Sequence, residues 1–268
     1  MVEHAPHPDI LAEPGGLLWR RSWRRRKATE PEAHQELVVL HGLQGHATYM
    51  IDGVVHELRQ GTILWALAGQ RHFLLSDSVN FDMWVALVSD RILAEDSDLP
   101  PIRMLPMAEA LAPRQVPQTI SDTLDMMASA QTSCTSPLTQ AAGLRLWLAH
   151  AWRHWQLAAD DAGKRTHPAV TKAAQMWHDN PARSLTDISR EAGLSASRLG
   201  RLFKSQIGQD VVAYRTEQKL RIFELIRATN PRLSLLSAAL ESGFGSYAQF
   251  YRAWRHRYGT SPAFRDVD

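Results

Sequence analysis

Cationic side chains recur at matching positions in two segments near the C-terminus. Arg201 is matched by Arg252 and Lys204 by Arg255, each pair 51 positions apart. Arginine can donate two parallel hydrogen bonds to O6 and N7 of guanine, and lysine can hold a phosphate as a point charge. The chemistry open to these residue types is therefore polar recognition of a nucleic acid. A solvated place on a helix surface is the alternative for any single cation, and the repeated placement argues against it.

The matching positions belong to a longer internal repeat. The stretch from Ser184 to Leu194 recurs at an offset of 50 residues as the stretch from Ser234 to Phe244. After one inserted residue near Gly245 the match continues at an offset of 51. Each copy predicts a short amphipathic helix, a turn at a glycine and a second, basic helix, which Ser195 or Ser246 is suited to cap. This is the layout of a helix-turn-helix unit, present twice.

One long helix, from Val211 to Ala228, is predicted between the two copies. At ~1.5 Å per residue it spans ~27 Å, so two recognition helices could reach major grooves ~34 Å apart. Because such helices read bases mainly from their N-terminal half, direct readout is expected of Ser197, Arg201, Gln249 and Arg252. Phosphate contacts are expected of Lys204, Arg255 and Arg257.

The composition fits a globular protein of two domains. The chain has 268 residues, of which 44% are hydrophobic and 22% are charged. It has no run of about 18 apolar residues and no basic segment followed by an apolar stretch at its start. Neither a membrane span nor a signal peptide is therefore expected. Cys134 is the only cysteine, which excludes an intrachain disulfide and fits a cytoplasmic location.

Charge is distributed unevenly along the chain. The formal net charge is +2, yet residues 165–268 hold 16 Lys and Arg against 9 Asp and Glu, and the remainder holds 14 against 19. Affinity for a polyanion should therefore lie in the C-terminal third, because phosphate contacts need clustered cations. A solvated basic surface would have the same composition, and the repeat is what favours DNA.

Regions of different periodicity follow one another. Strand-like runs occur at 36–40, 47–51, 63–67 and 81–88. Asp52-Gly53 is a strong hairpin signal, helical periodicity extends from about 107 to 159, and 160–164 is typical of a linker. We therefore predict an α+β protein with a β-domain at 1–105, a helical segment with linker at 106–164, and an all-α domain at 165–268.

The C-terminal repeat resembles a known family. The residues that carry the resemblance are 184–204, Gly208, Tyr214, Leu220, Glu241-Ser242-Gly243-Phe244, Phe250, Trp254 and the run from Arg257 to Arg265. They are similar to the DNA-binding domain of AraC/XylS-type bacterial transcription regulators. Trp254 stands where the family usually has phenylalanine, and Phe264 where it often has tyrosine. The resemblance implies a seven-helix domain with two helix-turn-helix units.

The resemblance also assigns reading positions on the two recognition helices. They fall on Ser197, Gly200, Arg201, Tyr247, Ala248, Gln249 and Arg252, nearly the set obtained from the residues themselves. The complete set of candidate DNA contacts is Ser197, Arg198, Gly200, Arg201, Lys204, Tyr247, Ala248, Gln249, Arg252 and Arg255.

The N-terminal region is similar to the cupin-like sensory domain that often accompanies this DNA-binding domain. His34, Glu36, Gly61, Gly69 and His72 fit the spacing of its two motifs loosely. A metal cupin normally supplies three histidines and one glutamate, and the second histidine of the first motif is absent here. The resemblance therefore implies a cupin-like β-barrel with following helices, whose pocket takes an organic effector without a metal or another cofactor.

Side chains that alternate inward along the strands would line such a pocket. Trp65, His72 and Trp84 could stack on an effector or hydrogen-bond to it, with His34 and Glu36 near the rim. Ordinary core packing is the alternative for Trp65 and Trp84, because aromatic residues in strands usually pack.

A basic run at 20–27 allows two interpretations. The Arg-x-x-x-Arg spacing of Arg20 and Arg24 could clamp a phosphate-bearing effector. The alternative is an exposed edge strand, whose charges discourage edge-to-edge aggregation.

An apolar stripe marks the helix before the linker. Leu144, Leu148, Ala151 and Trp155 recur at helical spacing. By the resemblance, helices in this position pair two subunits, so the stripe predicts a homodimer. Packing within one subunit is the alternative.

These features together predict a transcription regulator that is not an enzyme. We expect it to bind double-stranded DNA as a homodimer, with RNA polymerase as its protein partner and no membrane association. A small molecule in the barrel should change which half-sites the dimer occupies. The alternatives are a regulator controlled by its concentration or a partner protein, and a metal-cupin enzyme fused to a DNA-binding domain.

Overall fold

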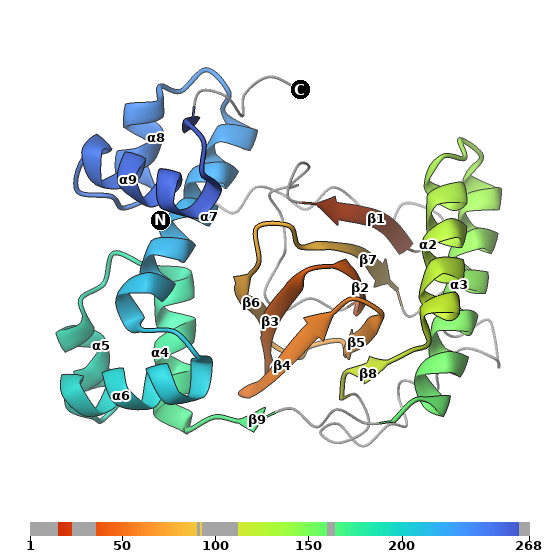
Figure 1. The fold of residues 1–268 in the computed structure, drawn as a ribbon, viewed down its shortest axis with the longest axis horizontal. Helices are drawn as coiled ribbons and strands as arrows, with labels where there is room; N and C mark the ends of the chain where they lie inside the picture. Colours follow the sequence, from red (N-terminus) through yellow and green to blue (C-terminus); the bar gives the residue numbers. More distant parts are fainter. Residues whose placement is uncertain (1–15, 23–35, 90–91, 93–111, 160–163, 263–268) are drawn as a thin grey trace. The chain divides into compact units, whose positions relative to one another are not determined.

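The computed structural model describes residues 16–22, 36–89, 92, 112–159 and 164–262. They divide into two compact units, one that extends to Gly163 and one that begins at Lys164, with the short segment 53–55 grouped with the second. Figure 1 shows strands and a helix pair in the first unit and helices in the second. The predicted α+β fold is confirmed.

Two antiparallel sheets form the centre of the N-terminal unit. The first has the strand order β1-β7-β2-β5-β8, and the second has the order β6-β3-β4-β9. The strands are β1 (Gly16–Ser22), β2 (Leu37–Gln44), β3 (His46–Ile51), β4 (Val54–Arg59), β5 (Thr62–Ala66), β6 (His72–Asp77), β7 (Asp82–Val88), β8 (Arg114–Gln115) and β9 (Lys164–Arg165). The four predicted strand-like runs correspond to β2, β3, β5 and β7, whereas β4, β6, β8 and β9 were not predicted. The prediction of helical periodicity from about 107 is wrong at β8, which pairs with β5.

The predicted hairpin at Asp52-Gly53 connects β3 to β4. Asp52 and Gly53 have φ values of 46° and 81°, and positive φ at both central residues defines the turn type that matches the twist of paired strands. The Asp52 carboxylate accepts a hydrogen bond from the Arg71 backbone N–H at 3.0 Å. The local sequence signal and the tertiary contact therefore agree at this turn.

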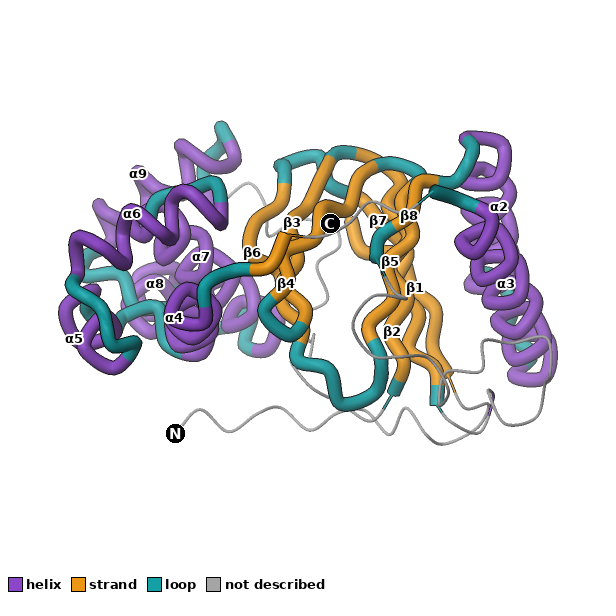
Figure 2. Tube along the Cα trace, turned by 90° about the horizontal axis from the view of Figure 1, so that it is seen from below, coloured by secondary structure: helices purple, strands orange, loops and turns teal. Residues whose placement is uncertain are grey.

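The N-terminal unit has three layers. Apolar side chains that include Val38, Leu64 and Met83 fill the space between the sheets. The outer face of the first sheet is covered by α2 (Gln118–Thr132) and α3 (Pro137–Leu157), as Figure 2 shows. A second apolar cluster, distinct from the first, lies between this sheet and the two helices.

Apart from β9 and residues 53–55, the described part of the C-terminal unit consists of helices and the turns between them. The described helices are α4 (Pro168–Asp179), α5 (Leu185–Glu191), α6 (Ala196–Ile207), α7 (Val211–Thr229), α8 (Leu235–Glu241) and α9 (Tyr247–Tyr258). A seventh helix, which the resemblance implies, is not among the residues that the structure describes. The connector predicted at 211–228 is α7, capped by Asp210 as expected from its side chain type.

Helix α7 contributes to the packing of both repeat copies. At its N-terminal end Tyr214 packs against Phe203 of α6, with ring centroids 5.2 Å apart. Further along, Phe223 packs against Phe250 and Trp254 of α9. Figure 1 shows the α5–α6 pair and the α8–α9 pair at opposite ends of α7. One continuous helix therefore sets the separation of the two recognition helices.

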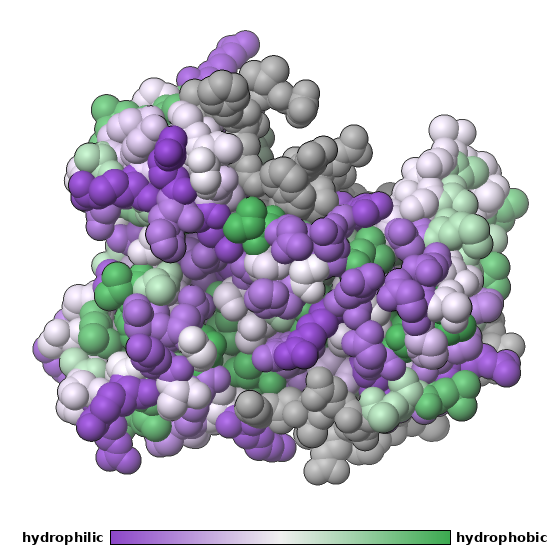
Figure 3. All heavy atoms as spheres, viewed as in Figure 1, coloured by the Kyte–Doolittle hydropathy of each residue, from purple (hydrophilic) through white to green (hydrophobic). Residues whose placement is uncertain are grey.

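Within the described residues, none of the helices combines the length and apolar character that a bilayer crossing requires. The face of the molecule drawn in Figure 3 is mainly hydrophilic, and its hydrophobic residues form small separate groups.

Candidate DNA-binding surface and effector site

Serine residues cap all four helices of the repeat at corresponding positions. The predicted caps Ser195 and Ser246 accept hydrogen bonds from the backbone N–H groups three residues later, at 3.3 and 3.2 Å. Ser184 and Ser234 make the same bond at the starts of α5 and α8, both at 3.0 Å. A serine cap contributes about 1 kcal/mol. The starts of both recognition helices, α6 and α9, are thus determined by local sequence.

Burial of one face fixes how α6 and α9 are oriented within their unit. Leu199 and Phe203 of α6 are fully buried, as is Phe250 of α9, and Trp254 is nearly so. Side chains on the opposite face must then meet solvent, because a helix has a period of 3.6 residues.

The candidate DNA contacts other than Tyr247 lie on this outer face, whereas the Tyr247 ring packs against the buried Phe250 with centroids 5.6 Å apart. Gly200 and Tyr247 are half-buried, and the others are exposed: Ser197, Arg198, Arg201, Lys204, Ala248, Gln249, Arg252 and Arg255. Among the described residues, no ion pair engages the five cations of this set. The two helices therefore present matching uncompensated charges, the arrangement that phosphate and base contacts need.

Packing within the protein does not require glycine at position 200. Gly200 lies inside α6, and a Cβ atom placed on it would meet nothing within 4 Å. Glycine inside a helix costs about 0.5–1 kcal/mol relative to alanine. Because packing does not demand glycine here, the position fits close approach by a ligand such as a DNA groove.

Replacement of Gly200 by alanine should separate stability from DNA binding. We expect Gly200→Ala to stabilise the C-terminal unit by about 0.5–1 kcal/mol, since alanine is the better helix former. Affinity for a specific site should fall several-fold, because the methyl group occupies the approach surface. Thermal unfolding and fluorescence anisotropy with labelled DNA measure the two effects. Unchanged affinity in Gly200→Ala would refute the close-approach role.

Gln249, a predicted base contact, is also hydrogen-bonded within the protein. Its Oε1 atom accepts a hydrogen bond from the backbone N–H of Gly245 at 3.0 Å, while Ser246 caps the same helix. Ser246 and Gln249 have the Ser-x-x-Gln spacing of a capping box, in which the glutamine would accept a hydrogen bond from the Ser246 N–H. Here it accepts from Gly245, one residue earlier. A two-bond contact with adenine would require Oε1 to leave Gly245.

Arg257 was expected to hold a phosphate, but its side chain pairs with a carboxylate of α7. Its side chain is only 13% exposed, and Nε lies 3.2 Å from Oε1 of Glu217 in α7. Tyr258 also donates a hydrogen bond to Glu224 of α7, at 2.8 Å. In this structure Arg257 therefore fastens α9 to the connector, and the expectation of a free phosphate contact is wrong because the carboxylate already compensates its charge.

Trp65 and Trp84 do not face the inside of the barrel, contrary to prediction. Both belong to the apolar cluster between the first sheet and the helices. The Trp65 ring packs edge-on against Trp152 of α3, with centroids 5.4 Å apart. Trp84 donates a hydrogen bond from Nε1 to Asp125 of α2 at 2.7 Å. Alternation along each strand directs these indoles outward, because neighbours such as Leu64 and Val85 point between the sheets.

The remaining effector candidates do not converge on one cavity. His72 lies in the second sheet, opposite Ile51, with Nδ1 3.0 Å from the carbonyl oxygen of Gln70. Glu36 is half-buried just before β2. His34 and Arg24 lie outside the described residues. Of the set expected to line a pocket, the described residues are thus not brought together.

Arg20 lies on β1, at the edge of the first sheet. Its NH2 group and Nε atom donate hydrogen bonds to the Asp82 carboxylate at 2.7 and 3.0 Å. This hydrogen bond raises the pKa of Arg20 above its ordinary value. Because Asp82 compensates the charge, the edge-strand interpretation describes residues 16–22 better than a phosphate clamp does.

A buried histidine lies between the first sheet and α2. His41 of β2 is fully buried, and its Nε2 atom is 2.9 Å from the Ser121 hydroxyl of α2. Burial lowers the pKa of His41 to about 4, an effect that the charge of Asp125 partly opposes. The histidine is therefore neutral near pH 7. Among the described residues, no group of three or more potential metal ligands occurs.

The predicted dimer stripe is internal to the subunit. Leu144, Leu148, Ala151 and Trp155 are all buried, and they pack against the first sheet. Trp155 Nε1 also donates a hydrogen bond to the carbonyl oxygen of Ala112 at 3.0 Å. The alternative of packing within one subunit therefore describes this face of α3.

Two capped helix-turn-helix pairs on one connector define a DNA-binding protein with two recognition helices. Family models extend this assignment to both units. A model described as an AraC-like ligand binding domain matches residues 18–146, and a helix-turn-helix domain model matches residues 188–264. The chain belongs to the AraC family of DNA-binding transcriptional regulators.

Similar proteins include the HTH-type transcriptional regulator ExsA of Pseudomonas aeruginosa. It is 30% identical over 79 residues, which are 30% of this chain and 28% of that protein. The arabinose operon regulatory protein of Escherichia coli is 32% identical over 97 residues, 35% of this chain and 33% of that protein. The matches thus span about a third of these curated relatives. The crystal structure of ToxT from Vibrio cholerae O395 aligns over 94% of this chain and 97% of its own, with 14% identity and a TM-score of 0.45.

Proposed function

We propose that this protein controls transcription by binding a specific DNA sequence through α6 and α9, under the influence of a small molecule bound by the N-terminal unit. The observation that carries the DNA assignment is the pair of exposed, matching cations Arg201 and Arg252 on two capped helices. Their spacing along α7 supports contact with two successive major grooves. The bases at the two sites would be guanines, which arginine recognises with two hydrogen bonds.

Substitution of these arginines tests the proposal. Arg201→Ala and Arg252→Ala should each weaken binding to a cognate site by ~1–3 kcal/mol, while weak and salt-sensitive binding to other DNA persists. Sites selected from random DNA by the wild-type protein supply the cognate sequence for titration. Arg190→Ala is a matched control, because this exposed arginine of α5 is already paired with Asp187. Equal specific affinity of wild type and both variants would contradict the assignment.

Effector dependence is tested on the same DNA. Affinity for the selected site should change when the correct small molecule is added, because a ligand that binds two conformations unequally shifts their populations. If DNA affinity is unchanged across the compounds that bind the N-terminal unit, sensing is refuted and control by concentration or by a partner protein remains.

The proposed homodimer requires a surface other than the predicted stripe. On the opposite side of α3, Leu146, His150, Arg153 and Leu157 repeat the same helical spacing, and the two leucines are 56% and 76% exposed. We place the subunit contact there, because exposed leucines on one helix stripe suit an isologous pairing. Sedimentation velocity should show a dimer that Leu146→Glu dissociates. A wild-type monomer at concentrations that saturate DNA would contradict the dimer.

A further inference from the structure

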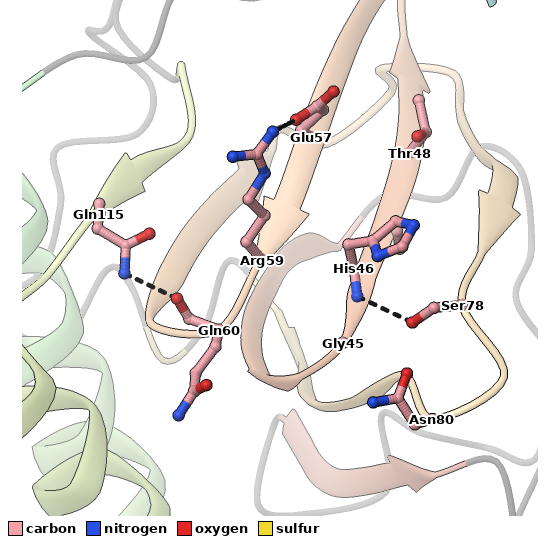
Figure 4. A pocket seen from close by; sticks show the side chains of 10 residues that line it. Gly45, His46, Thr48, Glu57, Arg59, Gln60, Ser78, Asn80 and Gln115 are labelled. Carbon is pink, nitrogen blue, oxygen red and sulfur yellow. Dashed lines mark hydrogen bonds and ion pairs between the residues drawn. The ribbon is translucent and has the colours of Figure 1, made fainter. Parts of the chain in front are cut away.

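A polar cleft lies on the outside of the second sheet. It is open to solvent on one side and has a volume of about 660 Å³. Figure 4 shows side chains from β3, β4, β8 and the turn between β6 and β7 around it. The lining residues are Gly45, His46, Ala47, Thr48, Glu57, Arg59, Gln60, Ser78, Asn80 and Gln115.

The cleft is separate from the space between the two sheets. Leu58 points into the core between the sheets, so its neighbours Glu57 and Arg59 point to the opposite face of β4. Leu58 and Leu64 are fully buried in that core. A polar molecule placed between the two sheets, among such leucines, would lose its hydration and find no hydrogen-bond partners. The outer cleft, by contrast, is lined by hydrogen-bonding side chains such as His46, Thr48 and Gln60.

The two charged side chains of the cleft bind each other. The Arg59 guanidinium contacts the Glu57 carboxylate, and the two side chains are 66% and 54% exposed. An ion pair this exposed stabilises a protein by about 0–1 kcal/mol at most. A ligand can therefore separate the pair at little cost, provided that it supplies a partner for each charge.

We propose that this cleft binds a zwitterionic molecule of the amino-acid class. The ligand carboxylate pairs with Arg59 and the ligand ammonium pairs with Glu57, so both charges stay compensated. Thr48 and Asn80 lie at the same cleft and offer a hydroxyl and an amide to a polar side chain. This assignment rests on the proposed function, because it identifies the effector class for the N-terminal unit.

Gln115 connects the cleft to the helix pair. Its Nε2 atom donates a hydrogen bond to the carbonyl oxygen of Gln60 at 2.7 Å, and its Oε1 atom accepts one from Thr62 at 3.1 Å. The next residue, Val116, donates a backbone hydrogen bond to Gly61 at 2.9 Å. Because α2 begins two residues later, a ligand that packs against Gln115 would hold the segment that leads into α2 and α3.

Binding to the full-length protein provides the test. Each common amino acid is added in turn at millimolar concentration while thermal unfolding is followed, and calorimetry then gives the affinity of any that stabilises the protein. We expect at least one to bind, and its N-acetyl and carboxamide derivatives, which lack one charge each, to bind about tenfold more weakly or worse. If no amino acid binds, the assignment of the ligand class is overturned.

Two variants locate the site. Glu57→Gln and Arg59→Gln should each weaken amino-acid binding by about tenfold or more, whereas Arg71→Gln, an exposed change outside the cleft, should not. The unfolding temperature without ligand shows that each variant is folded. Undiminished binding in both cleft variants would overturn the location.

DNA binding distinguishes this proposal from the proposed function. Both cleft variants should bind the selected DNA like the wild type when no amino acid is present, because α6 and α9 are unchanged. Hydrogen exchange of residues 114–118 should slow when the amino acid binds to the wild type. Unchanged exchange there would overturn the link to α2, and loss of specific DNA binding in the wild type would instead count against the proposed function.

Discussion

Replacement of Trp65 by alanine should destabilise the N-terminal unit by about 3–5 kcal/mol, the range for large aromatic residues removed from a core. Trp65 is 1% exposed and contacts Trp152 and Trp155 of α3 edge-on. Alanine would leave a cavity between the first sheet and α3 that these rings cannot fill without moving. Urea unfolding of the full chain, followed by hydrogen exchange of β5 and α3, measures the loss.

A conservative variant distinguishes packing from effector binding. Among the described residues, the Trp65 Nε1 atom has no hydrogen-bond partner, so Trp65→Phe loses contact area without breaking a hydrogen bond. It should therefore cost roughly 1–2 kcal/mol, about one small group of buried atoms. A stably folded Trp65→Ala protein that has lost only its response to a ligand would show that the indole is an effector contact after all.

Acidification should weaken the N-terminal unit through His41. In the unfolded chain this histidine has a pKa near 6.5, and in the folded protein burial lowers the pKa to about 4. Between these values the unfolded state binds more protons, so stability falls as the pH falls from 6.5 towards 4. The loss of unfolding free energy between pH 6.5 and pH 4 is about 3 kcal/mol, from 1.36 kcal/mol per pKa unit. This loss is absent above pH 6.5 and grows no further below pH 4.

A variant that does not titrate isolates this effect from the carboxylates. His41→Gln keeps a polar group beside Ser121 but has no proton to gain in this range. The free energy of unfolding at pH 7 and pH 4.5 should therefore change less in His41→Gln than in the wild type. Identical pH dependence in the two proteins would mean that His41 is not held neutral by burial.

The strands illustrate where sequence patterns stop being informative. All five residues of β5 are buried, because the second sheet covers one face of the strand and the α2–α3 pair covers the other. Alternation between apolar and polar residues is therefore lost, and the direction of Trp65 could not be predicted from its neighbours. The same double coverage hides the direction of Trp84 in β7, where every residue is buried.

Ion pairs between residues far apart in the chain also could not be predicted from sequence patterns. Arg20 is compensated by Asp82, 62 positions away, and Arg257 by Glu217, 40 positions away. No spacing rule connects such residues, so charge alone placed both arginines among candidate ligand contacts. The cleft was missed for a similar reason, because Glu57 and Gln115 come together only through the pairing of β5 with β8.

Local patterns were enough to predict the duplicated helix-turn-helix unit, the caps Ser195 and Ser246, the α7 connector and the outward cations Arg201 and Arg252. These features depend on helical period and on hydrogen bonds within three or four residues, which are written locally in the chain. The folded chain was needed to show which strand faces pack against the helices, which charges are paired and where a polar cleft lies. Those properties arise from contacts between distant segments, and side-chain types do not specify which segments will meet.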